Sequence, residues 1–318
     1  MVFGDSSVGE FYWDGMCLLA GGLLAFRIVR AYAGFRWGLA AAATPLAVFV
    51  LGTAHDLIGE GLSEISSAGF ISVAALCAIA GRRRPAAAIA AGIFATLGFY
   101  TRLNNLIAAL GVAVFALPLY VPTSALARPS TWWRRVSWRT ALAVPALVGV
   151  GVLLFAWRTY HYTGVFSVFY GTQRQMLAIW QPGMSFPVVA GRAMRSVMMV
   201  LTVNDPPRFD AYALPVMAGA VAAILSIAGV PRLRSLPAAA VLTFFATIAG
   251  AFVASGSAYP GRFSVHAIPI TCALTICAVA SARVSARRSG DTEQARTPRQ
   301  DRLSTESSYL HQRGAASS

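Results

Sequence analysis

The chain has 318 residues, of which 57% are hydrophobic and 12% are charged, and its mean hydropathy is +0.61. Because a soluble domain carries about 25% charged residues, this composition excludes an ordinary soluble protein and indicates a polytopic membrane protein. The net charge of +14 comes from arginine alone, and the arginines stand between apolar runs, which favours a role in membrane orientation over binding to nucleic acid.

The apolar runs predict an all-α fold, a bundle of about nine transmembrane helices. Several runs are shorter than the roughly 20 residues of an ideal span, so their ends are defined only to within a few residues. In chain order the predicted spans are about Gly15–Ala31, Gly38–Ala54, Ile65–Gly81, Ala86–Tyr100, Leu106–Val121, Thr140–Trp157, Ala211–Gly229, Pro237–Ser255 and Val265–Ala282. Residues 1–282 therefore form one membrane domain. The Ser-, Thr- and Arg-rich remainder, 283–318, cannot bury a core and is predicted to be a disordered cytoplasmic tail.

The arginine-rich connections assign a side of the membrane to each loop, because the positive-inside rule places them in the cytoplasm. With this orientation the inner connections before the tail contain twelve arginines and no acidic residue. These are Arg27, Arg30, Arg36, Arg82, Arg83, Arg84, Arg128, Arg134, Arg135, Arg139, Arg232 and Arg234. A wrong number of spans would break this separation.

The outer segments then contain every acidic residue before the tail. These are Asp5, Glu10, Asp14, Asp56, Glu60, Glu64, Asp205 and Asp210. The same orientation places Met1 outside, after an acidic leader that is no signal peptide. Such a start is difficult to insert, so we expect a further span upstream of Met1; a native protein with an external N-terminus is the alternative.

The acidic stretch 55–64 is the first candidate site. Asp56, Glu60 and Glu64 are too costly to place within a bilayer, and they could supply a general base or metal ligands. Glu60 and Glu64 are four residues apart, so a helical turn would place them on one face. A solvated acidic loop is the alternative interpretation.

Two further candidates bind anions. Arg102 lies in the short turn TRLNN between two spans, where it could hold an anion; an arginine that only extends to the interface is the alternative. Residues 188–201 read as an amphipathic helix lying on the membrane. Its Arg192 and Arg195, three residues apart, suit bidentate recognition of a phosphate, and binding of ordinary anionic lipid is the alternative.

The long outer loop 158–210 interleaves aromatic and hydrogen-bonding residues. Tyr160, His161 and Tyr170 in its first part suit a sugar face or a polyprenyl chain, although aromatic residues are also ordinary at a membrane interface. At the entrance of the last span, Arg262 and His266 are four residues apart, and ionisable groups in such a place rarely serve packing alone.

Several chemistries have no motif in this sequence. A P-loop, a dinucleotide-binding glycine pattern, HExxH and GxSxG are all missing, so an ATP-driven or zinc-hydrolase function has no support. The cysteines lie in apolar runs without zinc-ligand spacing and are predicted to be buried. They are Cys17, Cys77, Cys272 and Cys277.

Three short motifs resemble the GT-C superfamily of glycosyltransferases, and most nearly its dolichyl-phosphate-mannose:protein mannosyltransferase-like (family 39-like) bacterial members. They are Ser63-Glu64 after an outer loop, GFYTRLNN at 98–105, and YPGRFSVHAIP at 259–269. The family's TRP-G turn reads here as Thr101-Arg102-Leu103-Asn104, without its proline. Its late R-[FY]…P pattern is matched by Arg262, Phe263 and Pro269. The resemblance covers about 15–282.

The resemblance implies transfer of a sugar from a polyprenyl-phosphate donor to an acceptor, at the outer face of a bacterial plasma membrane. The essential Asp of such enzymes follows their first span, and that region would lie upstream of Met1. The resemblance leads us to expect Asp56 and Glu64 near the acceptor or a divalent metal ion, with His266 assisting. The donor phosphate would be bound by Arg102, Arg192, Arg195 and Arg262, and the substrate would contact Tyr160, His161 and Tyr170.

Two other classes remain open at this point. A transporter or flippase of a lipid-linked saccharide also needs many spans, but its polar groups should lie at mid-membrane, where this sequence has almost none. A non-catalytic membrane protein of envelope assembly would tolerate loss of every outer acid. Either the chain is an active enzyme or it is a fragment without activity.

Overall fold

A computed structural model describes residues 6–51, 63–168, 183–202, 211, 213–255 and 262–283. The chain divides into two compact units, Met1–Ala278 and Val279–Ser318. The described residues are helical apart from turns and one isolated β-bridge, Pro122–Pro237. This confirms the all-α class. The predicted tail lies outside the described residues except for Arg283, so its disorder stays a prediction.

The α-helices of the first unit are α1 (Ser6–Ala33), α2 (Phe35–Leu51), α3 (Ser63–Gly81), α4 (Pro85–Thr101), α5 (Leu106–Gly111), α6 (Pro129–Trp132), α7 (Trp138–Thr163), α8 (Phe186–Thr202), α9 (Leu214–Ile227) and α10 (Ala238–Ser255). Short 3₁₀ helices join them: η2 (Leu103–Asn105), η3 (Val112–Ala116), η4 (Thr123–Ala125), η5 (Trp133–Arg135) and η6 (Arg262–Ala267). A final helix follows η6 and covers 268–283.

Four helices are long and apolar enough to cross a membrane, which indicates an integral membrane protein. They are Gly9–Ala33, Ser63–Gly81, Trp138–Thr163 and Val265–Arg283. The other five predicted spans coincide with shorter apolar helices, each of at most 17 residues. A helix rises 1.5 Å per residue, and the hydrocarbon core is about 30 Å thick. The number of nine spans therefore stays a prediction.

Three helices begin or end at other residues than the sequence predicts. Helix α1 begins at Ser6, so Asp14, predicted to lie in a polar leader, is inside the helix and 2% exposed. The predicted span 106–121 ends early: α5 tightens into η3, which stops at Ala116, and Pro118 cannot continue a helix. Helix α7 continues to Thr163, past the point where the sequence predicts a loop.

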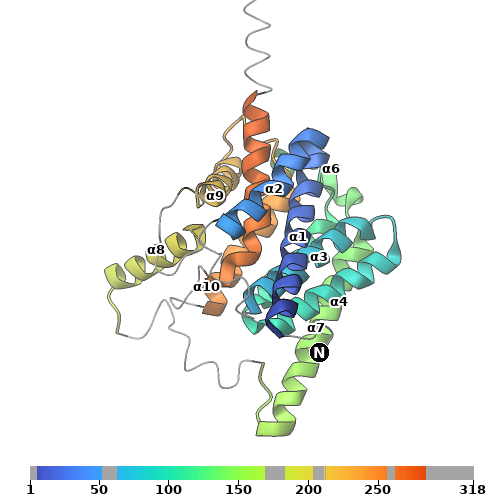
Figure 1. Ribbon diagram of the computed structural model, residues 1–318, viewed down its shortest axis with the longest axis vertical. Helices are drawn as coiled ribbons and strands as arrows, with labels where there is room; N and C mark the ends of the chain where they lie inside the picture. Colours follow the sequence, from blue (N-terminus) through green and yellow to red (C-terminus); the bar gives the residue numbers. More distant parts are fainter. Residues whose placement is uncertain are drawn as a thin grey trace, which may run out of the picture. The chain divides into compact units, whose positions relative to one another are not determined.

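Close contacts at small residues fix how neighbouring helices run. Trp13 of α1 donates an indole hydrogen bond to Ser66 of α3 (2.8 Å), and Cys17, one turn later, contacts Gly69. Helices α1 and α3 are therefore parallel. Small residues at such contacts allow backbones to approach, as in membrane helix pairs generally. Helix α2 packs against α1, and α4 against both α3 and α7 (Figure 1).

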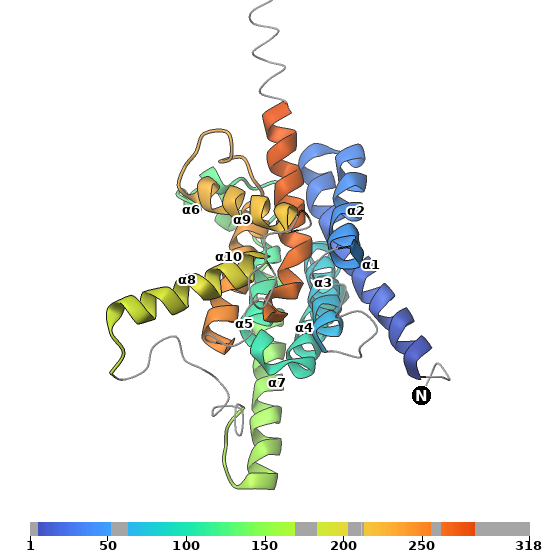
Figure 2. The same ribbon diagram turned by 60° about the vertical axis from the view of Figure 1, so that its left-hand side comes forward.

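Helix α9 departs from the predicted arrangement. The spans predicted at 211–229 and 265–282 both run inward and should therefore be parallel. In the structure, Pro215 of α9 contacts Thr275 of the final helix and Gly219 contacts Thr271, so the two helices run in opposite directions at this contact. Figure 2 shows α9 lying across the final helix. With 14 residues, α9 is about 21 Å long, too short for a perpendicular crossing.

The arginine-bearing connections meet at one end of the bundle, here called the arginine-rich end. Tyr32, after α1, hydrogen-bonds Ser235 of the α9–α10 connection (2.7 Å). The backbone of Ser124 donates to Arg234 (3.0 Å), and Arg82 reaches the carbonyl of Ala116 (3.5 Å). The connections that the charge distribution assigns to one side therefore share one end of the structure.

The opposite end is here called the carboxylate end. It includes the start of α1, the start of α3 and the end of α4. Both views show the start of α1 and the C-terminal end of α7 on the side of the bundle away from α6 (Figures 1 and 2). The described carboxylates, Glu10, Asp14 and Glu64, all belong to this end.

Close helix packing predicts different effects on stability when two glycines are replaced by alanine. A Cβ at Gly219 would meet the backbone oxygen of Thr271, whereas a Cβ at Gly149 in α7 would have nothing within 4 Å. We expect Gly219→Ala to destabilise the protein by about 1–3 kcal/mol and Gly149→Ala to be neutral or stabilising, since alanine favours a helix. Thermal unfolding in detergent measures both, and equal effects would contradict the packing of α9.

Candidate functional site

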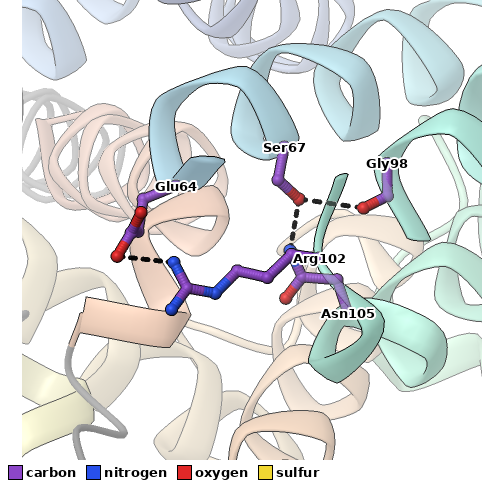
Figure 3. Close-up of polar contacts among 5 residues, drawn as sticks. All are labelled: Glu64, Ser67, Gly98, Arg102 and Asn105. Atoms are coloured by element: carbon purple, nitrogen blue, oxygen red, sulfur yellow. Dashed lines mark hydrogen bonds and ion pairs between the residues drawn. The ribbon is translucent and has the colours of Figure 1, made fainter. Parts of the chain in front are cut away.

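A buried ion pair lies at the carboxylate end. Glu64, in the first turn of α3, and Arg102, directly after α4, are joined by an Oε1–Nη1 contact of 2.5 Å, with side chains 2% and 17% exposed (Figure 3). Of the acidic stretch 55–64, only Glu64 and its neighbour Ser63 are described. The structure thus pairs two residues that the sequence predicts separately as an acid and an anion ligand.

The turn after α4 directs Arg102 toward Glu64. Arg102 has an extended backbone (φ −151°, ψ 106°) that ends α4, and its N–H donates to Phe99 (3.1 Å). The chain then forms η2, in which the Asn105 side-chain amide donates to the Ser67 hydroxyl. Ser67 in turn donates to the carbonyl of Gly98 (3.1 Å) (Figure 3). These bonds tie the turn to α3.

Helix geometry favours both charges in these positions. A carboxylate in the first turn of a helix is stabilised by the positive N-terminal end of the helix dipole, and a cation after the last turn by the negative end. Glu64 follows the start of α3, and Arg102 follows the end of α4. The antiparallel helices therefore present complementary ends, which compensates part of the cost of removing both groups from water.

His266 joins this pair from the far end of the sequence. It lies in η6, which packs against α3 and α10, and it is 4% exposed. Its Nε2 has no hydrogen-bond partner among the residues that the structure describes. The Arg102 guanidinium is close enough to act electrostatically on its imidazole. Glu64, Arg102 and His266, all predicted site residues, are thus assembled from three distant segments.

The predicted amphipathic helix is confirmed as α8, which extends the predicted bounds by one or two residues. Its first half is exposed, with Phe186 at 82%, and its second half packs against α9 and η6. Arg192 is half-buried and Arg195 is exposed. The second half of α8 therefore contacts the helix that contains His266. Arg262 is the first residue of that helix.

The remaining predicted residues stand apart from this group. Tyr160 and His161 lie on the last two turns of α7, which extend past the ends of α3 and α4 in both views (Figures 1 and 2). The ring of His161 packs against Tyr162 (5.3 Å between centroids). Asp56 and Tyr170 lie outside the described residues.

Helix α7 continues past the polar residues from which the sequence predicts a loop, and it ends at a glycine. Gly164 has a positive φ of 70° and its N–H donates to Tyr160 (2.8 Å), which is the usual end of a helix at a left-handed glycine. The sequence predicts an outer loop from Arg158 onward, whereas the structure continues α7 to Thr163, with most of these residues exposed. The glycine, rather than the polarity, indicates where the helix ends.

Asp14 is a buried acid that polarity alone does not reveal. It lies at the carboxylate end of α1, next to Trp13, which hydrogen-bonds α3. Asp14, Cys17 and Gly21 follow one another at spacings of three and four. That spacing places all three on one helical face, and Cys17 and Gly21 contact α3 and the final helix. This spacing is the signal that could have identified Asp14 as buried.

No group of three or more His, Cys, Asp or Glu side chains that could hold a metal ion occurs in the described ranges. Glu64 is paired with Arg102 there, so a cation at Glu64 would have to displace a guanidinium. Asp56 and Glu60, the other predicted ligands of a divalent ion, are outside these ranges.

No protein-family model, curated protein or solved structure matches this chain.

The ion pair predicts strongly coupled effects on stability. Replacing one partner leaves the other buried and unpaired, so Glu64→Gln and Arg102→Gln should each cost roughly 3–5 kcal/mol. The E64Q/R102Q double variant should lose much less than the sum. Unfolding in mixed micelles measures the cycle, with Glu10→Gln, an exposed acid of the same end, as the control. Additive effects would show that the pair does not contribute.

Proposed function

We propose that the protein is an integral-membrane glycosyltransferase of the GT-C type, which transfers a sugar from a polyprenyl-phosphate donor to an acceptor at the extracytoplasmic face. The proposal rests on one observation: the buried group of Glu64, Arg102 and His266 at the end of the bundle opposite the arginine clusters. An acid, a guanidinium and an imidazole in one place are the groups that such a transfer needs.

The reaction would be a displacement at the anomeric carbon. The acceptor oxygen forms a bond to this carbon while the bond to the phosphate oxygen breaks, and the sugar configuration is inverted. A carboxylate takes the acceptor proton, and guanidinium groups neutralise the departing phosphate. Glu64 and Asp56 are the candidate bases. Arg102, which is paired with Glu64, is the candidate guanidinium for the phosphate.

The ion pair itself supports a coupled role for Glu64 and Arg102. A guanidinium has five N–H donors in a planar fork, enough to contact Glu64 and a phosphate oxygen together. When the donor phosphate engages Arg102, the negative charge of Glu64 is less fully neutralised. The carboxylate then becomes a stronger base for the acceptor. His266, with its Nε2 unpartnered among the described residues, is placed to hydrogen-bond either substrate.

The second arginine set would bind the donor from the membrane side. Helix α8 is amphipathic and contacts η6, so it would lie at headgroup level with its exposed Phe186 in lipid. Arg192, Arg195 and Arg262 would then meet a lipid-linked phosphate. Tyr160 and His161, on the protruding end of α7, would contact the acceptor or the sugar outside the bundle.

The orientation that we propose has about nine spans, the carboxylate end outside a bacterial plasma membrane and the C-terminal tail inside. The meeting of the arginine-bearing connections at one end supports it. A flippase is less favoured, since the acidic and basic side chains of the four candidate spans lie toward the ends of those helices and not at their middles.

Substitution of single side chains tests the proposed sugar transfer. We expect Glu64→Gln, Arg102→Gln and Arg262→Ala each to lower turnover of a polyprenyl-phosphate sugar by about 10²- to 10⁴-fold. Release of polyprenyl phosphate in proteoliposomes measures the rate, and elution as a single folded species shows that insertion is intact. Glu10→Gln should retain full activity.

Two results would contradict the proposal. Full activity in Arg262→Ala and Glu64→Gln would exclude these residues from the chemistry. Movement of the intact sugar lipid across the bilayer without transfer would instead favour a flippase, and loss of neither activity in any outer variant would favour a non-catalytic assembly protein.

The orientation has its own test. Tyr162, at the end of α7, is 75% exposed, and Arg83 is exposed at the arginine-rich end. In whole cells, a membrane-impermeant maleimide should label Tyr162→Cys but not Arg83→Cys. The native cysteines are buried or half-buried and give little background. Labelling of both positions from outside would exclude the proposed topology.

A further inference from the structure

The segment Arg128–Arg139, here called the Arg–Trp segment, lies at the arginine-rich end and has no part in the proposed transfer. It runs from the residue before α6, through η5, to the first turn of α7. Its twelve residues contain four arginines and three tryptophans: Arg128, Arg134, Arg135, Arg139, Trp132, Trp133 and Trp138. No other part of the chain combines the two residue types at this density.

The tryptophans place the segment at the depth of the membrane interface. Trp138 is the first residue of the candidate span Trp138–Thr163. The ring of Trp133 packs edge-on against that of Trp138, with centroids 4.4 Å apart, and both rings remain exposed, at 54% and 42%. Trp132 packs against the main hydrophobic core and fixes the segment to the bundle. Exposed indoles at a span's end are typical of the headgroup region.

The arginines of the segment are exposed and not neutralised within the described part of the chain. Arg128, Arg134, Arg135 and Arg139 are all exposed, and none forms an ion pair with a described residue. The chain has no acidic residue between Glu64 and Asp205. The tail, 283–318, is itself basic, with seven arginines and four carboxylates.

One of these arginines is also held in place. The guanidinium of Arg135 lies over the ring of Tyr120, 5.9 Å from its centroid, a cation–π contact that favours one position for this charge. The segment is therefore an ordered surface, fixed by Trp132 on one side and by Tyr120 on the other.

We propose that the Arg–Trp segment binds the headgroup of an anionic phospholipid in the adjacent leaflet. Guanidinium groups bind phosphate oxygens in a bidentate manner, and basic residues beside a span attract anionic lipid. A soluble anion would need the arginines only. The exposed rings of Trp133 and Trp138 add contact with the glycerol and upper acyl region, which only a lipid provides.

A second basic cluster offers a matched control. Arg83 and Arg84, in the α3–α4 connection, are exposed. They lie at the same end, since the neighbouring Arg82 donates to Ala116, and they have no tryptophan near them in the sequence. R83Q/R84Q and R134Q/R135Q remove the same charge from the same end of the molecule. If the positive charge of this end were sufficient, the two variants would lose lipid equally.

The test measures binding of dioleoyl phosphatidylglycerol to the purified full chain in a zwitterionic detergent by native mass spectrometry, with dioleoyl phosphatidylcholine as the neutral comparison. We expect phosphatidylglycerol to bind at least about tenfold more tightly than phosphatidylcholine, since each basic residue near an anionic surface contributes roughly fivefold. R134Q/R135Q should lose this preference, W133A should weaken it, and R83Q/R84Q should keep it. Thermal unfolding of each variant verifies that the exposed substitutions leave the fold intact.

Several outcomes would overturn the proposal. One is equal loss in R83Q/R84Q and R134Q/R135Q, which would mean unspecific attraction to the arginine-rich end. Another is equal binding of the two phospholipids by the wild type. A third is displacement of the lipid by inorganic phosphate or by polyglutamate at matched concentration, which would assign the segment to a soluble anion or an acidic protein. Because sugar transfer is not measured, these results are independent of the proposed function.

Discussion

The structure depends on one constraint: a charge inside an apolar helix bundle must have an opposite charge beside it. Glu64 is almost fully buried and is paired with Arg102. An isolated carboxylate in such a place would cost several kcal/mol. The pair can form only if the start of α3 and the end of α4 lie together. The Ser67–Asn105 and Ser67–Gly98 bonds hold them there, so the ion pair, the turn and the helix packing depend on one another.

The same constraint organises the charges of the whole described chain. The carboxylates lie at one end of the bundle and the arginine-bearing connections at the other. Charges at helix ends avoid the apolar middle, where they would lack both water and partners. A molecule built in this way has two chemically different ends. We propose sugar transfer at the first and binding of anionic lipid at the second.

Much of this architecture could be predicted from the sequence, because apolar runs and charge distribution are local properties. Each predicted span falls on an apolar helix, and α8 was predicted to within two residues at either end. What could not be predicted depends on partners distant in the sequence. Asp14 is buried on a face of α1 whose Cys17 and Gly21 contact α3. The α9 crossing is set by the final helix.

The site shows the same limit. The sequence predicts Glu64, Arg102 and His266 as polar candidates beside apolar spans, but it does not predict the pairing of Glu64 with Arg102. Ser67 lies in an apolar run, where a serine is ordinary in a membrane helix, and nothing in the sequence shows that it accepts from Asn105. Arg102 could be identified as a polar residue in a turn; its extended backbone, which ends α4, is a property of the folded chain.

The difference in exposure within the ion pair gives the proposed reaction an order. Arg102 is the more exposed partner and Glu64 the more buried one, so an anion arriving from outside meets the guanidinium first. In the proposed reaction, Glu64 would be neutralised by Arg102 until the donor binds. Arg102 would then share its donors with the phosphate, and the carboxylate would accept the acceptor proton. Activation of the acceptor would thus require a bound donor, which would limit hydrolysis of the sugar lipid by water.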